Sequence, residues 1–186
     1  VTPASTLSGC SGSGMVSYSA ISCTSMAGQG ITISGQSAIS ISLASDAPAS
    51  QQLVMGSTGN ALASFLFTET SNAENVKITV LTVSQNVGSS SIVKSGFGNV
   101  TLYNAGLPVG TAGSAVASGT SVYNYTFNFG TPVIVPQSGS LGLVLKGDVA
   151  SYYSSGATNN STSTFAVNTA QVTALGQTSS ATSSVS

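Results

Sequence analysis

The chain of 186 residues has almost no charged side chains. They make up 4% of it, whereas about 25% is usual in globular proteins. Its cations are Lys77, Lys94 and Lys146, and Arg and His are absent. Nucleic acid binding requires a basic patch that neutralises phosphates, and binding to anionic membrane surfaces requires clustered Lys or Arg. We therefore expect no nucleic acid partner and no charge-driven membrane contact.

The lack of His also removes most catalytic chemistry. No Ser-His-Asp or Cys-His arrangement can form, and zinc would find only two Cys and four carboxylates without CxxC spacing. The carboxylates offer at most a glycosidase-type pair, Glu69 with Glu74 or Asp46 with Asp148, or a calcium site at Asp46 or Asp148. We favour turn, strand-end and capping roles for them, and expect no enzyme, no metal and no cofactor.

Long apolar runs are missing as well. No run approaches the roughly 20 residues needed to cross a bilayer, so the sequence predicts no membrane span. Hydrophobic residues still make up 41% of the chain, which does not fit the low hydrophobicity of disordered proteins. In place of charge the chain has Ser, Thr, Gly and β-branched residues. Their surface barely titrates and is barely screened by salt, which suits an extracellular material.

Strand patterns recur about every 8–12 residues, between Gly, Ser and Asn turns, and helix patterns are nearly absent. This predicts an all-β protein, an antiparallel β-sandwich of Ig-like or jelly-roll-like type with about ten strands, over residues 31–175. The run 76–84 is apolar on both faces and predicts a central strand, and 132–136 lies between prolines and predicts an edge strand. The other expected strands are 31–34, 38–44, 51–55, 62–70, 97–104, 107–110, 122–130, 140–150 and 164–175.

Two further segments flank the predicted sandwich. Residues 1–30 form an N-terminal extension that contains the only two cysteines, Cys10 and Cys23. We expect them to pair within the chain as a clasp, worth up to ~3 kcal/mol in the chain-entropy model. Reduced thiols and a bond between subunits are the alternatives. The low-complexity segment 176–186 is expected to be flexible or engaged with a neighbouring subunit.

Glycosylation is one candidate modification. In a chain this rich in Ser and Thr, roughly three or four Asn-x-Ser/Thr sequons arise by chance, so their number proves nothing. An intramolecular isopeptide bond is a second candidate, with Lys77 or Lys146 as the amine. We favour instead that these lysines keep strand surfaces polar. The candidate N-glycosylation sites are Asn99, Asn124, Asn159 and Asn160.

One row of aromatic side chains alternates along the run 122–130. Tyr123, Tyr125, Phe127 and Phe129 share a face, so they form either part of the core or a platform on which sugars stack. Sugar platforms favour exposed Trp and Tyr, whereas Trp is absent here and half the row is Phe. We therefore favour packing in the core of a sandwich.

The stretch ISISLASDAPASQQLVMGSTGNALASFLFTETSNAENVKITVLTVS, with the later pieces VTLYNAGLPVG and PQSGSLGLVLKGDV, resembles a recurring surface domain. It is similar to secreted β-sandwich domains of cell-surface proteins in bacteria of the candidate phyla radiation. More loosely, it resembles subunits of archaeal and bacterial surface filaments, such as bundling pili and threads, which link by donor-strand exchange. The resemblance covers roughly residues 38–172 and implies the fold, but it supplies no active-site residues.

These observations lead to one main functional expectation. The chain would be a structural subunit of an extracellular filament, pilus-like fibre or surface layer at the cell surface. Copies of it would join head-to-tail, with a strand donated from about 1–30 or from 164–186. The alternative is a monomeric adhesin or carbohydrate-binding module with glycan partners. A glycan-active enzyme is the weakest of the three.

Overall fold

The computed structural model describes residues 11–13, 16, 20–22, 36–88, 95–151 and 159–186. The chain divides into two units, residues 1–34 and 35–186. In the first unit, β1 (Ser11–Ser13) and β2 (Ala20–Ser22) form an antiparallel pair. Cys10, Cys23 and the expected strand 31–34 lie outside the described residues.

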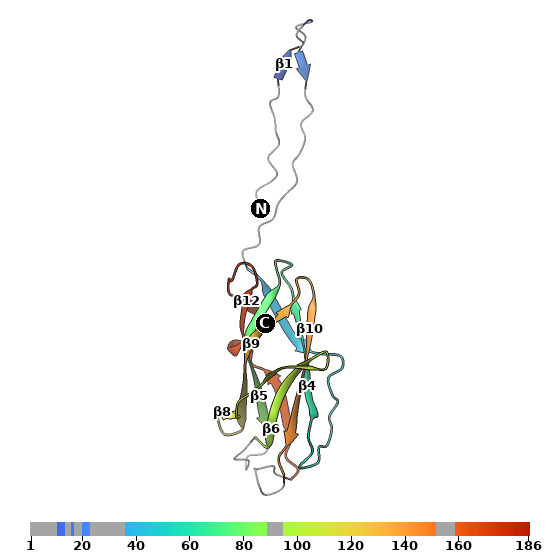
Figure 1. The fold of residues 1–186 in the computed structure, drawn as a ribbon, viewed down its shortest axis with the longest axis vertical. Helices are drawn as coiled ribbons and strands as arrows, with labels where there is room; N and C mark the ends of the chain where they lie inside the picture. The colour runs from blue at the N-terminus through green and yellow to red at the C-terminus, as the bar shows by residue number, and fades with distance from the viewer. Residues whose placement is uncertain (1–10, 14–15, 17–19, 23–35, 89–94, 152–158) are drawn as a thin grey trace. The chain divides into compact units, whose positions relative to one another are not determined.

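The second unit is an all-β sandwich of two sheets (Figure 1), which confirms the predicted fold class. One sheet has the order β13-β3-β4-β10-β6-β7, and the other has the order β11-β5-β9-β8 with β12 also on β5. All pairs are antiparallel except β13 with β3. The strands are β3 (Ala38–Leu43), β4 (Asn60–Glu69), β5 (Val76–Val87), β6 (Phe97–Asn104), β7 (Leu107–Thr111), β8 (Val116–Ala117), β9 (Val122–Val135), β10 (Ser140–Val149), β11 (Ser163–Val167), β12 (Thr173–Gly176) and β13 (Ser184–Val185).

The core lies between the two sheets and follows from alternation along the strands. In an extended strand every second side chain points to the same face, so one face of each sheet can be wholly apolar. β4 contributes Phe65 and Phe67 to the core, and β10 contributes Leu143 and Leu145, all 3% exposed or less. The facing sheet contributes alternate residues of β5 and β9.

β5 lies inside its sheet, as its two apolar faces predict, with β9 on one side and β11 and β12 on the other. Its outward-facing side chains pair through hydroxyl and amide groups. Thr82 and Thr126 have their hydroxyl oxygens 3.1 Å apart, and the Ser84 hydroxyl donates to Asn124 Oδ1 over 2.8 Å. Cross-strand pairs of this kind stabilise a sheet without charge.

The structure differs from the sequence prediction in three strands. Residues 51–55 form no strand, because β4 already has β3 and β10 on its two sides and leaves this segment as a connection. The segment 164–175 is not one strand. It is divided into β11, a 3-10 turn η1 (Thr169–Gln171) and β12. Residues 132–135 continue β9 rather than forming a separate strand. Among the described residues the strand partner of β9 beyond Asn124 is β5, so residues 125–135 of β9 lie at an edge of this sheet.

No helix in the described part of the chain is long and apolar enough to cross a membrane.

Candidate functional site

The segment that follows β12 folds back along that strand. The backbone N–H of Gly176 donates to the carbonyl of Ala181 over 2.8 Å, and the N–H of Ser183 donates to the carbonyl of Ala174 over 2.9 Å. Residues 181–183 therefore extend the five-stranded sheet as the second arm of a hairpin. The segment 176–186, for which we expected flexibility or engagement with a neighbouring subunit, makes these hydrogen bonds within its own chain.

The last residues of this segment pair with the other sheet. β13 runs parallel to β3, with Val185 opposite Ile39. The Ile41 N–H donates to the Ser186 carbonyl over 2.8 Å, and the Ser186 N–H donates to the Ile39 carbonyl over 3.1 Å. The N–H of Ser184 donates to the carbonyl of Ser37 over 3.1 Å. One short segment thus joins the edges of both sheets.

The change of sheet occurs at Ser183, which is 4% exposed. Its hydroxyl lies 2.5 Å from the hydroxyl of Ser37, which is also buried. The Gln36 side chain donates to the carbonyl of Thr182 over 2.7 Å, and Val185 packs against the core. We call residues 36–41 the β3 seat, because they bind the segment by backbone hydrogen bonds and one buried hydroxyl pair.

Glu74 binds the turn that precedes this segment. Its Oε2 accepts hydrogen bonds from the backbone N–H groups of Thr178 (2.7 Å) and Ser179 (3.0 Å), and its Oε1 accepts one from the Ser179 hydroxyl. The Ser179 hydroxyl and N–H, then the Thr178 N–H and the Lys77 charge, hold the pKa of Glu74 below its ordinary value of 4.5. The Glu74 carboxylate lies close against Gly176, since a Cβ at that position would be 2.1 Å from Glu74 Oε1 and the side chain would have to shift.

Two neighbours of Glu74 also hold the turn. The Asn75 side chain donates to Gln177 Oε1 over 2.9 Å, and the Asn75 carbonyl accepts from the Gln177 N–H over 2.8 Å. Lys77 donates to the hydroxyl of Ser180 over 3.4 Å. Three polar residues at and just before the start of β5, namely Glu74, Asn75 and Lys77, therefore bind the turn 177–180.

Glu69 binds a different turn from the one that Glu74 binds. It accepts hydrogen bonds from the N–H groups of Ser71, Asn72 and Ser138, each over 2.9 Å, and from the Ser71 hydroxyl. Burial alone would raise the pKa of Glu69, but these hydrogen bonds outweigh it and lower the pKa below 4.5. The side chain thus fixes the junction between the end of β4 and the turn that leads into β10.

The two aspartates also accept hydrogen bonds from neighbouring segments. Asp148 accepts from the Gly59 N–H and from the Asn99 amide, both over 2.7 Å, and the Asn99 amide holds its pKa below the ordinary 3.8. Asp46 accepts from the Ser64 hydroxyl over 2.8 Å. Among the described residues no three His, Cys, Asp or Glu side chains gather as a metal site would require.

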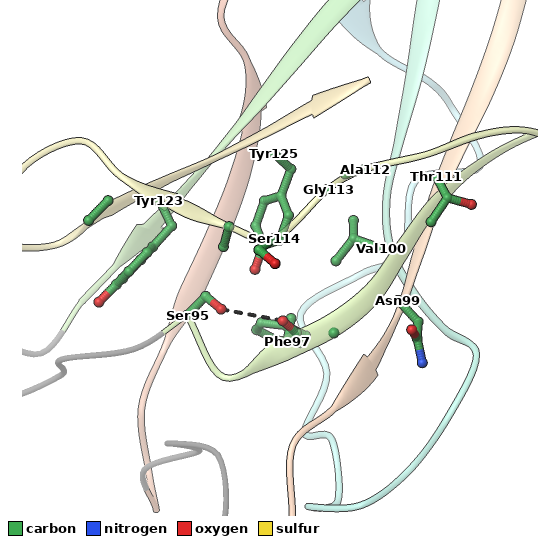
Figure 2. A pocket seen from close by; sticks show the side chains of 13 residues that line it. Ser95, Phe97, Asn99, Val100, Thr111, Ala112, Gly113, Ser114, Tyr123 and Tyr125 are labelled. Carbon is green, nitrogen blue, oxygen red and sulfur yellow. Dashed lines mark hydrogen bonds between the residues drawn. The ribbon is translucent and has the colours of Figure 1, made fainter. Parts of the chain in front are cut away.

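A pocket of about 630 Å³ lies beside the start of β6, the connection from β7 to β8 and the start of β9. Figure 2 shows Val100 and Asn99 on opposite sides of β6, with Val100 on the side of Tyr125. The Tyr125 hydroxyl donates to Gln85 Oε1 over 3.1 Å, and burial raises the pKa of Tyr125 above 10. The lining combines hydroxyl and amide groups with aromatic rings and carries no charged side chain.

The predicted aromatic row lies in the core. Tyr123, Tyr125, Phe127 and Phe129 are between 0% and 7% exposed. The two tyrosines also line the pocket, while Phe129 packs so closely against Gly110 that a Cβ there would lie 2.9 Å from its ring. The row therefore packs between the sheets, and only its tyrosine end borders a cavity.

The candidate glycosylation sites have different surroundings. Asn99, Asn159 and Asn160 are exposed, with Asn159 and Asn160 in a turn. Asn124 is half-buried in β9 and accepts from Ser84. Of the two lysines considered for an isopeptide bond, Lys146 lies over the Tyr103 ring, with its Nζ 4.8 Å from the ring centroid, and Lys77 contacts the turn 177–180.

Comparison of the chain with protein-family models, curated proteins and solved structures gave no match. By fold the chain is an antiparallel β-sandwich protein. Its sequence did not reveal the β3 seat or the bond between Glu74 and the turn 177–180. The only available signal was a glycine directly after an alternating stretch, at Gly176, which is common at strand ends.

Proposed function

We propose that the chain is a structural subunit of an extracellular filament, pilus-like fibre or surface layer, whose copies join head-to-tail by strand exchange. The observation that supports this most is that the outermost strand at two sheet edges is much shorter than the strand it pairs with. β9 has 14 residues, but its outer neighbour β8 has two, and β3 has six residues, but its outer neighbour β13 has two. Incompletely covered edges accept strands from other chains.

The edge of β9 is the longer of the two. β8 pairs with Tyr123 and Asn124, and from Tyr125 to Val135 the strand partner within the described residues is β5. Pro132 interrupts this edge, since proline has no N–H to donate, which limits indiscriminate pairing. The N-terminal part of the edge is still able to accept a strand in register.

The surface composition supports close packing between copies. Burying a charge in an interface costs several kcal/mol per ion, and this chain carries few charges on its outer faces. Four large apolar side chains are 65–75% exposed in the second unit, and they would gain from burial. They are Leu43, Val54, Leu107 and Val116. A head-to-tail contact between such surfaces does not close on itself, so it generates a filament.

The extracellular location rests on composition and on resemblance. The two cysteines favour an oxidising compartment, and a surface with few charges suits an extracellular material. The similarity to secreted surface domains, stated above on residues 38–172, points the same way. These features also agree with a surface that neither pH nor salt alters strongly.

The test is direct observation of assembly by the full chain. Purified protein at increasing concentration should give filaments or sheets in negative-stain images and a mass that grows with concentration in light scattering. A species that stays monomeric from micromolar to millimolar concentration, between pH 3 and pH 8, would contradict the proposal.

A carbohydrate-binding role is the second candidate, and the uncharged pocket favours it. Rings and hydroxyl groups that line one cavity are the usual recognition elements for neutral sugars. In that case immobilised glycans should retain the protein, and Tyr123→Phe with Thr111→Val should weaken retention at least tenfold without lowering the thermal midpoint by more than a few degrees. Retention by no glycan would eliminate this candidate.

A further inference from the structure

Besides its hairpin bonds to β12, in which Ala181 and Ser183 pair with Gly176 and Ala174, the segment 177–186 makes two groups of contacts. Those of residues 182–186 are made with the β3 seat, residues 36–41. Those of the turn 177–180 are made with Glu74, Asn75 and Lys77. The same segment of a second copy would make the first group equally well, because the seat is a continuous stretch of one strand. The second group keeps the turn bent beside its own β5.

The segment is suited to leave its seat. Within residues 181–186 only Ser183 is fully buried, and Ser184 and Ser186 are exposed. Ser180, in the turn, has a φ of 56°, a left-handed conformation that is strained for a residue other than glycine. Straightening of the turn would release this strain, and tight hinge loops under strain are the usual origin of exchanged strands.

Resting on the proposed function, we propose that residues 177–186 are the strand exchanged between copies, that the β3 seat receives them, and that Glu74 is the latch that keeps them in their own chain. While Glu74 binds the N–H groups of Thr178 and Ser179, the segment closes its own sheet. When these bonds are lost, the turn opens, and the segment reaches the β3 seat of the next copy. Each copy then donates and receives once, which gives an open chain of subunits.

The charge of Glu74 controls the latch. Hydrogen bonds from N–H and O–H groups to a carboxylate are stronger than those to a neutral carboxyl group. Lys77 on β5 is the cation that acts on Glu74, and Glu69, at the end of β4, is bound to Ser71, Asn72 and Ser138. Because the folded pKa of Glu74 is lowered, the latch holds above its ordinary pKa and opens as pH falls through the lowered value.

The first experiment measures uptake of a labelled peptide with the sequence of residues 177–186, QTSSATSSVS. Fluorescence anisotropy should show at least tenfold more peptide bound by Glu74→Gln than by the wild type at pH 7. Wild-type uptake should rise as pH falls from 6 to 3, whereas uptake by Glu74→Gln should change little. A peptide with Lys in place of Ser183 should not bind, because that hydroxyl is buried.

Asp148→Asn is the matched control. It removes one negative charge from another carboxylate that also accepts a backbone N–H, and its hydrogen bonds go to Gly59 and Asn99 rather than to the segment. Its uptake should equal that of the wild type. The proposal that Glu74 is the latch would be wrong if Glu74→Gln and the wild type took up equal amounts of peptide. It would also be wrong if uptake rose as much in Asp148→Asn as in Glu74→Gln.

The second experiment separates the identity of the donor from the function. Ser37→Cys with Ser183→Cys places two thiols where the hydroxyl oxygens lie 2.5 Å apart, and oxidation would fix the segment in its own chain. Oxidised protein should not form filaments, and a reductant should restore them. If the oxidised variant assembles like the wild type, another segment is the donor and the inference fails while the proposed function stands. If neither wild type nor Glu74→Gln assembles under any condition, the proposed function itself fails.

Discussion

Gln85 carries an amide group into the core of the sandwich, where its side chain is fully buried. Its Nε2 donates to the carbonyl of Ser95 over 2.7 Å and to the hydroxyl of Ser163 over 3.0 Å, and its Oε1 accepts from the Tyr125 hydroxyl. One residue of β5 thus connects the segment before β6, β9 and β11. A polar network of this kind specifies a single arrangement only if every member is bonded.

Gln85→Leu should therefore destabilise the fold by about 2–4 kcal/mol, because it leaves the Ser95 carbonyl and the Tyr125 hydroxyl buried without partners. Urea unfolding followed by tyrosine fluorescence measures the loss. Tyr125→Phe alone should cost about 1 kcal/mol, and the double variant should cost clearly less than the sum of the two. Additive costs would show that the amide and the hydroxyl do not act as a unit.

At the scale of elements, the hairpin β6–β7 contains a strained residue. Its two-residue loop is Ala105-Gly106, with φ values of 47° and 81°. Both positive values fit a type I′ turn, which suits the twist of paired strands and prefers Asn followed by Gly. An alanine side chain makes no hydrogen bond that would stabilise this left-handed conformation, whereas an Asn side chain hydrogen-bonds to its local backbone.

Ala105→Asn should raise the free energy of unfolding by about 0.5–1 kcal/mol by relieving this strain. A rise of a few degrees in the thermal midpoint would show it. Gly106→Ala, at the neighbouring position, should lower stability by at least about 1 kcal/mol, since φ is 81° there. A stabilising Gly106→Ala would mean that the loop adopts another turn.

Strand positions could be predicted most readily where one face is buried, although the run 107–110 also located β7, which has no buried residue. Alternation along 62–70, 97–104 and 140–150 located β4, β6 and β10 to within about two residues. It failed at 51–55, because a strand also needs an unoccupied neighbour, and β4 has none. Pairing is a property of the whole sheet and leaves no local pattern in the sequence.

The candidate site was less predictable than the core. The segment QTSSATSSVS has no periodic apolar face, and its order comes from backbone hydrogen bonds to β3 and from a single carboxylate, Glu74. Backbone groups are the same in every sequence, so composition alone predicted a segment that is flexible or engaged with a neighbouring subunit, and it gave no sign of this pairing. The aromatic row behaved differently, because burial of Tyr125 and Phe127 follows directly from alternation.

At the scale of the whole molecule, the few ionisable groups act as structural acceptors. Glu69, Glu74 and Asp148 all have pKa values below the ordinary values of 4.5, 4.5 and 3.8. A carboxylate with a lowered folded pKa contributes stability above its unfolded pKa and loses that contribution as pH falls through the folded pKa. Tyr125 has the opposite shift, because burial raises its pKa. The contribution of Tyr125 to stability is present below pH 10 and is lost as pH rises above it.

The free energy of unfolding should therefore be nearly constant from about pH 5 to pH 10, since these carboxylates stay ionised and Tyr125 stays neutral across that range. It should decline below about pH 4 and again above about pH 10. Sodium chloride between about 0.05 and 1 M should have little effect on the plateau, because few exposed charges are available for screening. Urea unfolding at each pH, on Cys-reduced and oxidised protein alike, measures the profile. A steep loss of the free energy of unfolding between pH 5 and 7 would require an ionisable group other than these. Glu69→Gln should make the decline below pH 4 less steep if ionised Glu69 contributes to it.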